Sequence, residues 1–111
     1  MNSERLKQLL VYLKEEPEDP FNHYAVAMEL IGNEPSKALQ YLANTIKQYP
    51  DYLPAYYQAA ALYADAGQLT EAQQTYEQGI ALARQQNNAN TLRELQSAYN
   101  QFLFENEDEL N

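Results

Sequence analysis

The residues that could perform acid–base chemistry are scarce and are not spaced for it. His23 is the only histidine of the chain, and Glu29 follows it six residues later. Side chains meet on one helix face at separations of three or four residues, so these two point to different faces. General acid–base catalysis needs its groups within hydrogen-bond reach. We therefore predict that His23 takes no part in catalysis, and its place among the bulky residues of the repeat pattern described below favours a packing role.

A second group of ionisable residues surrounds Pro17. Glu15 and Glu16 precede this proline, and Glu18 and Asp19 follow it. Acids on both sides of a proline are typical of an exposed turn, where carboxylates stabilise helix N-termini. We interpret these acids as capping residues and not as a catalytic carboxylate pair.

The motifs of nucleophilic, phosphate and metal chemistry are missing from the sequence. It contains no cysteine, which excludes disulfide bonds and thiolate metal sites. No glycine-rich phosphate loop, HExxH motif or suitably spaced Ser-His-Asp set occurs. The sequence therefore predicts no catalytic centre, no cofactor and no metal site, and it points away from an enzyme.

The charge balance narrows the class of partner. The chain has 16 Asp and Glu residues against 7 Lys and Arg, for a net charge of −9. Such a surface repels nucleic-acid phosphates and anionic membranes, so we predict neither as a partner. Apolar or basic protein segments are compatible with it. The sequence shows no export signal and no apolar run near the ~20 residues of a membrane span, so we expect a cytoplasmic protein.

Apolar residues recur at three- and four-residue spacing, which predicts helices throughout and no strand. Prolines, glycines and asparagines divide this pattern into six helices. They run from Ser3 to before Pro17, from Asp19 to about Gly32, from Pro35 to before Pro50, from Leu53 to Ala66, from Leu69 to Ala83, and from the 87–90 asparagine segment to about Phe104. The last seven residues hold four acids and no base, and we expect them to fray.

Two of these helix pairs carry the same spaced pattern, 33 residues apart. It consists of bulky and small residues at helical spacing, then a small residue and a bulky one on the next helix. The second copy is Tyr56, Ala59, Ala60 and Tyr63, followed by Ala72 and Tyr76. The first copy is His23, Val26, Ala27 and Leu30, followed by Ala38 and Leu42. This pattern resembles the tetratricopeptide-repeat family.

The resemblance implies an all-α fold, a right-handed helix-turn-helix repeat array of about six antiparallel helices. It extends from about Ser3 to Phe104 within one domain, 1–111. The implied parts are an N-terminal half repeat (3–18), repeat one (19–50), repeat two (51–84), a C-terminal capping helix (88–105) and an acidic tail (106–111). Ala27 and Ala60 occupy the small positions at which the two helices of a pair approach closely.

The sequence departs from the family pattern at three places. The first repeat is one residue short between Leu30 and Ala38, which predicts a tight turn. Arg84 replaces the proline expected at the end of repeat two. Gln96 fills a position where a small residue would face a packed partner helix, so we expect the last helix to act as a cap.

The resemblance also implies an inner, concave surface lined mainly by the first helix of each pair. Apolar residues form a stripe there, separate from the core face. The residues of this stripe are Phe21, Tyr24, Met28 and Ile31 on the second helix, and Tyr57, Ala61 and Ala64 on the fourth. A helix that is apolar on all sides must be covered on all sides. Either neighbouring helices cover the stripe, or it forms a groove for an apolar peptide or a second copy of the chain.

The function that follows is a protein–protein interaction module, in which this stripe binds an apolar peptide or protein surface. The alternative is a self-associating structural protein that uses the same groove as a homodimer interface. Some family members bind acidic chaperone tails through Lys and Asn at positions held here by Tyr24 and Met28, so that activity is not expected. Phe102, Leu103 and Phe104 cannot all face one core, and we expect Phe104 to be exposed or covered by a partner.

Overall fold

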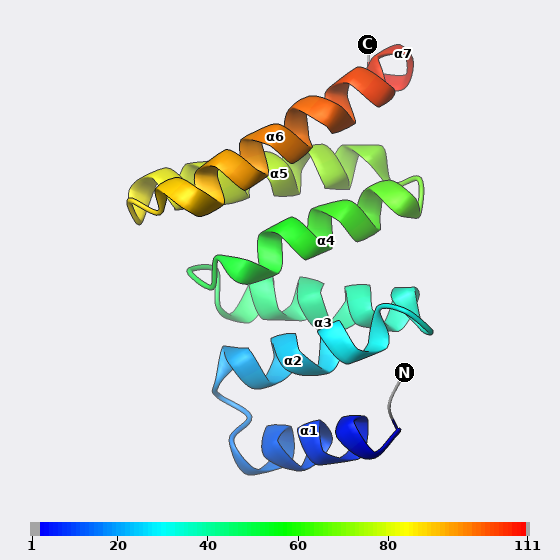
Figure 1. Cartoon of the computed structure of the whole chain (residues 1–111), viewed down its shortest axis with the longest axis vertical. Helices are drawn as coiled ribbons and strands as arrows, with labels where there is room; N and C mark the ends of the chain where they lie inside the picture. Colours follow the sequence, from blue (N-terminus) through cyan, green and yellow to red (C-terminus); the bar gives the residue numbers. More distant parts are fainter. Residues whose placement is uncertain (1–2, 111) are drawn as a thin grey trace. The chain divides into compact units, whose positions relative to one another are not determined.

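The computed structural model describes residues 3–110, which fold into helices and short turns (Figure 1). The helices are α1 (Ser3–Glu15), α2 (Pro20–Leu30), α3 (Pro35–Gln48), α4 (Pro54–Asp65), α5 (Leu69–Gln85), α6 (Ala89–Glu105) and α7 (Glu107–Leu110). The predicted all-α fold is confirmed, and α1 to α6 have nearly the predicted bounds. None of the helices in this described range is long and apolar enough to cross a membrane.

The chain forms two compact units, one up to Ala55 and one from Tyr56 onward, so the boundary falls within α4. In the first unit α1 packs on α2, and α2 packs on α3. In the second unit α5 packs on α6, and α5 also contacts α4, as shown below. Consecutive helices within each unit run antiparallel (Figure 1).

Local capping interactions in the first unit connect α1 to α2. The Asp19 carboxylate accepts a hydrogen bond of 3.0 Å from the backbone N–H of Phe21, and Pro20 takes the first helical turn as predicted. The side-chain amide of Asn22 donates to the backbone oxygen of Glu16 at 3.0 Å. This amide satisfies a carbonyl that the end of α1 leaves without a helical partner.

His23 has a structural role in the same turn. Its Nε2–H donates to the backbone oxygen of Pro17 at 2.6 Å. The hydroxyl of Tyr49 donates to that same oxygen at 3.3 Å, and the two rings lie 6.0 Å apart. The histidine therefore fixes the α1–α2 turn against the end of α3, in agreement with its predicted packing role.

Small residues in the core of each unit let the helices approach closely. Ala27, Ala38, Ala60 and Ala72 are all completely buried. The helices also approach closely at Gly79 on α5, a position that the sequence pattern did not single out. A Cβ atom placed at Gly79 would lie 2.9 Å from the Cβ of Tyr56 on α4 and 3.3 Å from a methyl of Leu95 on α6.

An aromatic cluster joins α5 to α6. The ring of Tyr76 lies 5.5 Å from Tyr99 and 5.5 Å from Phe102, within the range of favourable aromatic pairs. The Tyr99 hydroxyl donates to Glu77 at 2.7 Å. Burial, followed by this hydrogen bond, raises the pKa of Tyr99 above its ordinary value of 10.0.

The expectation that residues 105–111 fray is wrong for Glu107–Leu110, which form the short helix α7. Asn106 ends α6 by donating from its side-chain amide to the backbone oxygen of Phe102 at 2.9 Å. The Asn106 carbonyl then accepts from the backbone N–H of Leu110 at 3.1 Å, and Leu110 is half-buried. The hydrogen bonds of Asn106 and the partial burial of Leu110 support this helix despite the acidic composition of the segment. Asn111 lies outside the described residues.

The run of three apolar residues at the end of α6 divides as the sequence predicts. Phe102 is 3% exposed and belongs to the aromatic cluster, whereas Phe104 is 75% exposed.

We expect Gly79→Ala to lower the free energy of unfolding by about 1–3 kcal/mol, as overpacking of a tight core does. An alanine in an open helical position would instead raise it by about 1 kcal/mol, so the sign of the change reports the contact with Tyr56. Urea denaturation measures it. Gly32→Ala is the matched control, because its added methyl would meet no atom within 4 Å. Equal stability of Gly79→Ala and the natural chain would contradict the packing of α4 on α5.

The raised pKa of Tyr99 predicts a loss of stability in alkali. A phenol with a higher pKa in the folded state contributes stabilisation that is complete below the unfolded value of 10.0 and is lost as pH rises through the folded pKa. Tyr99→Phe should lower the free energy of unfolding at neutral pH by about 1 kcal/mol, because it removes the hydrogen bond to Glu77. The difference should shrink above pH 10, as denaturation at several pH values would show. A pH-independent difference would contradict the assignment.

Candidate peptide-binding groove

The second unit contains a groove of about 410 Å³ between α4 and α6. Its lining residues are Tyr57, Ala61, Ala64 and Asp65 from α4, Tyr76 from α5, Ala98, Gln101, Phe102 and Glu105 from α6, and Asn106. Within this unit α5 lies between α4 and α6 in the view of Figure 1. The groove therefore has two helical walls and a floor formed by an aromatic residue of the helix between them.

The helical period explains how the α4 wall is formed. Tyr57, Ala61 and Ala64 recur at spacings of four and three, so they share one face of the helix. The two alanines are short, which leaves room above the rings of the floor. Tyr57 lies on the same wall, and 37% of its surface is exposed. The arrangement presents one large aromatic side chain beside a row of small ones.

The charged residues of the groove are both acids, and both end a helix. Asp65 is the last residue of α4, and Glu105 is the last residue of α6. Burial, and next the neighbouring groups Tyr57, Asp65 and Glu105, raise the pKa of Tyr76 above its ordinary value of 10.0. The hydroxyl of Tyr76 therefore lies in the negative field of both carboxylates and stays protonated at neutral pH.

Three of the predicted contact residues are brought together in this groove: Tyr57, Ala61 and Ala64. The other four lie on α2, in the first unit. Phe21 is 56% exposed, and Met28 and Ile31 are half-buried. Tyr24 packs edge-on against Tyr52 with ring centres 5.7 Å apart, and burial raises the pKa of Tyr24. Neighbouring side chains thus cover part of the α2 stripe.

Sequence reasoning missed the residues that α6 contributes to the groove. The repeat pattern aligns Tyr57 and Ala61 with Arg93 and Ser97, which are not lining residues. The actual wall contains Ala98 and Gln101. Gln101 lies one helical turn after Ser97 on the same face, and Ala98 is the next residue along the helix, so the pattern found the side of α6 but not the residues that line the groove. The spacing of three from Ala98 to Gln101 was the available signal.

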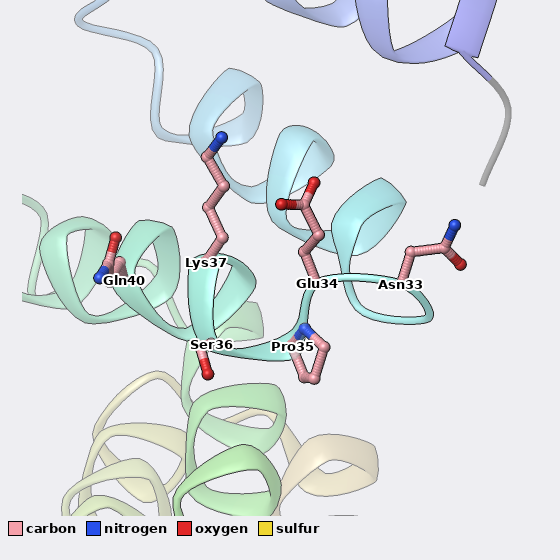
Figure 2. Close-up of a pocket in the computed structure, with 6 residues that line it drawn as sticks. All are labelled: Asn33, Glu34, Pro35, Ser36, Lys37 and Gln40. Atoms are coloured by element: carbon pink, nitrogen blue, oxygen red, sulfur yellow. The ribbon is translucent and has the colours of Figure 1, made fainter.

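Another hollow lies at the α2–α3 turn, around Pro35, Lys37 and Gln40. Figure 2 shows that the polar side chains there diverge: Lys37 and Glu34 extend to one side of the ribbon and Ser36 to the other. Such a set cannot converge on one ligand. Within residues 3–110, no group of three or more His, Asp or Glu side chains is arranged to hold a metal ion.

The comparisons with known proteins agree with the fold and the repeat pattern. The profile of the tetratricopeptide repeat matches residues 30–95. A crystal structure of a tetratricopeptide repeat domain protein from Salinibacter ruber is 36% identical and has a TM-score of 0.73. The match covers 77% of this chain and 96% of that one. A solution structure of a tetratricopeptide repeat domain protein from the same organism is 37% identical to this chain and has a TM-score of 0.72. The match covers 78% of this chain and 88% of that one.

A solution structure of a protein from Bordetella parapertussis has a TM-score of 0.79, with coverage of 96% of this chain and 92% of that one. Its identity is 19%, so it shows a shared fold alone. Among curated proteins, none matches the chain significantly. The family profile and the Salinibacter ruber structures together assign the chain, which belongs to the tetratricopeptide-repeat family.

Proposed function

We propose that this protein binds an apolar segment of another protein in the groove between α4 and α6. Members of the family are generally protein–protein interaction modules, which supports a binding role. The observation that carries the proposal is the partly exposed ring of Tyr57 beside the short side chains of Ala61 and Ala64. A ligand side chain can enter above the alanines and bury the tyrosine ring.

The size and chemistry of the groove fit binding. Its volume of about 410 Å³ lies in the usual range for ligand sites and admits a few side chains of a peptide. Tyrosine offers a large and rigid contact area together with a hydroxyl group. The polar lining groups are carboxylates, phenols and amides, and the groove holds no histidine, serine or cysteine. This composition favours recognition over nucleophilic catalysis.

The α2 stripe is proposed as a second contact surface, with Phe21, Tyr24, Met28 and Ile31 as its residues. Phe21 is the side chain most available to a partner there. The Tyr24 ring also supports the fold through Tyr52, so truncating Tyr24 would mix effects on binding and stability. Phe21→Ala is the cleaner probe of this surface.

The groove is tested by panning a phage-displayed random peptide library on the full chain and on Ala61→Arg. We expect apolar peptides from the natural chain, and a loss of about tenfold or more in their affinity for Ala61→Arg, because the long side chain fills the groove. Loss of a central contact commonly costs 2 kcal/mol or more, and 1.4 kcal/mol is tenfold. Fluorescence polarisation with the selected peptides measures the affinities.

Ala81→Arg is the matched control, since Ala81 is exposed on α5 and does not line the groove. Peptides that bind both variants as tightly as the natural chain would place the binding surface elsewhere. Light scattering of the natural chain and Ala61→Arg tests the alternative function. A dimer that is lost only in Ala61→Arg would show that the groove is a homodimer interface.

A further inference from the structure

The helices of this chain differ in the charge of their last turns, and α2, which does not line the groove, also has no basic residue there. The helices α1, α3 and α5 carry Lys14, Lys47 and Arg84 in their last turns. The two helices that form the groove walls have no basic residue in the last turn. They end instead in Asp65 and Glu105, and both of these acids line the groove.

An acid at a helix C-terminus is in an unfavourable position. The free carbonyl groups there carry a partial negative charge, so cations stabilise this end and anions destabilise it. Asp65 and Glu105 therefore add their full charges to two helix ends that are already negative. Such a placement does not contribute to the stability of α4 or α6, and it concentrates negative potential at one end of the groove.

The protein itself does not neutralise this end of the groove. The side-chain carboxylate of Asp65 has no hydrogen bond or ion pair with any described residue. The carboxylate of Glu105 accepts one neutral hydrogen bond, from the side-chain amide of Gln101 at 3.1 Å. No lysine, arginine or histidine lines the groove. The site thus combines an apolar surface with two carboxylates whose charge is not balanced by the lining residues.

We propose that the protein segment bound in this groove carries a lysine or arginine side chain next to its apolar contact residues. This inference rests on the proposed function of the groove and adds the charge of the partner. The aliphatic part of the basic side chain lies along Tyr57 and Ala61, as long cationic side chains commonly lie on apolar surface. Its cationic group reaches the carboxylates of Asp65 and Glu105.

The experiment compares two double variants that change the net charge equally. Asp65→Asn with Glu105→Gln removes both groove carboxylates. Asp108→Asn with Glu109→Gln removes two exposed acids of α7, outside the groove. Each pair exchanges one aspartate and one glutamate for its amide. The same phage-displayed random peptide library is panned on the natural chain and on both double variants.

We expect the natural chain and the α7 variant to select apolar peptides enriched in lysine and arginine, and the groove variant to select apolar peptides without that enrichment. A basic peptide selected on the natural chain should bind the groove variant about threefold to tenfold more weakly, since exposed ion pairs are individually modest. Its affinity for the natural chain should also fall as salt is raised. The melting temperature of the groove variant should be unchanged or higher, because two unfavourable charges at helix ends are removed.

Selection of equally basic peptides by the natural chain and the groove variant would overturn the inference. So would an equal loss of peptide affinity in the α7 variant, because that would indicate a general effect of net charge. A self-associated state that only the groove variant loses would also overturn it, in favour of a second copy of the chain. Failure of the proposed function is distinguishable from these results. In that case Ala61→Arg would bind the selected peptides as tightly as the natural chain does.

Discussion

The groove depends on the close packing of α5 between α4 and α6. Gly79 lets α5 approach Tyr56 so closely that an added methyl would lie 2.9 Å from the Cβ of that tyrosine. Interiors at native packing density cannot absorb such an overlap without moving a helix. The same approach holds Tyr76 against Tyr99 and Phe102, with its ring at the floor of the groove. The absence of a side chain at Gly79 thus sets how closely the helices of the two walls approach the helix that forms the floor.

The charges at the ends of two helices in the second unit do not favour the fold. Lysines or arginines at the ends of α4 and α6 would complement the helix dipoles, as Arg84 does on α5. The chain instead has acids at both positions, beside an aromatic floor. Local departures from the rules that stabilise a fold are expected at functional sites, and here the departure occurs at two acids that line the groove.

The first unit uses its polar residues differently. The one histidine of the chain shares the carbonyl oxygen of Pro17 with the hydroxyl of Tyr49. This arrangement connects α1, α2 and α3 through one backbone atom and leaves the imidazole engaged in packing. Tyr24 is likewise held by Tyr52. Tyr24 and Tyr57, which look alike in the sequence, therefore differ in the structure: Tyr24 packs against Tyr52, whereas 37% of the surface of Tyr57 is exposed.

The sequence by itself determined the helices, their order and the family. Prolines and glycines follow the ends of α1 to α4, and asparagines follow those of α5 and α6. The spacing of Ala27, Ala60 and Ala72 identified completely buried positions. Local rules suffice for these features because capping and helical periodicity act within a few residues of the chain. The exposure of Phe104 followed from the same geometry.

Tertiary structure decided the rest. It showed which faces of α4 and α6 enclose the groove, placed Asp65 and Glu105 at its end, paired Tyr24 with Tyr52, and formed α7 from a segment expected to fray. It also identified the close approach of α5 to Tyr56 and Leu95 at Gly79. Apart from α7, whose capping is local, these features depend on contacts between residues far apart in the sequence, and a periodic pattern contains no information about which of several apolar faces a neighbouring helix will cover.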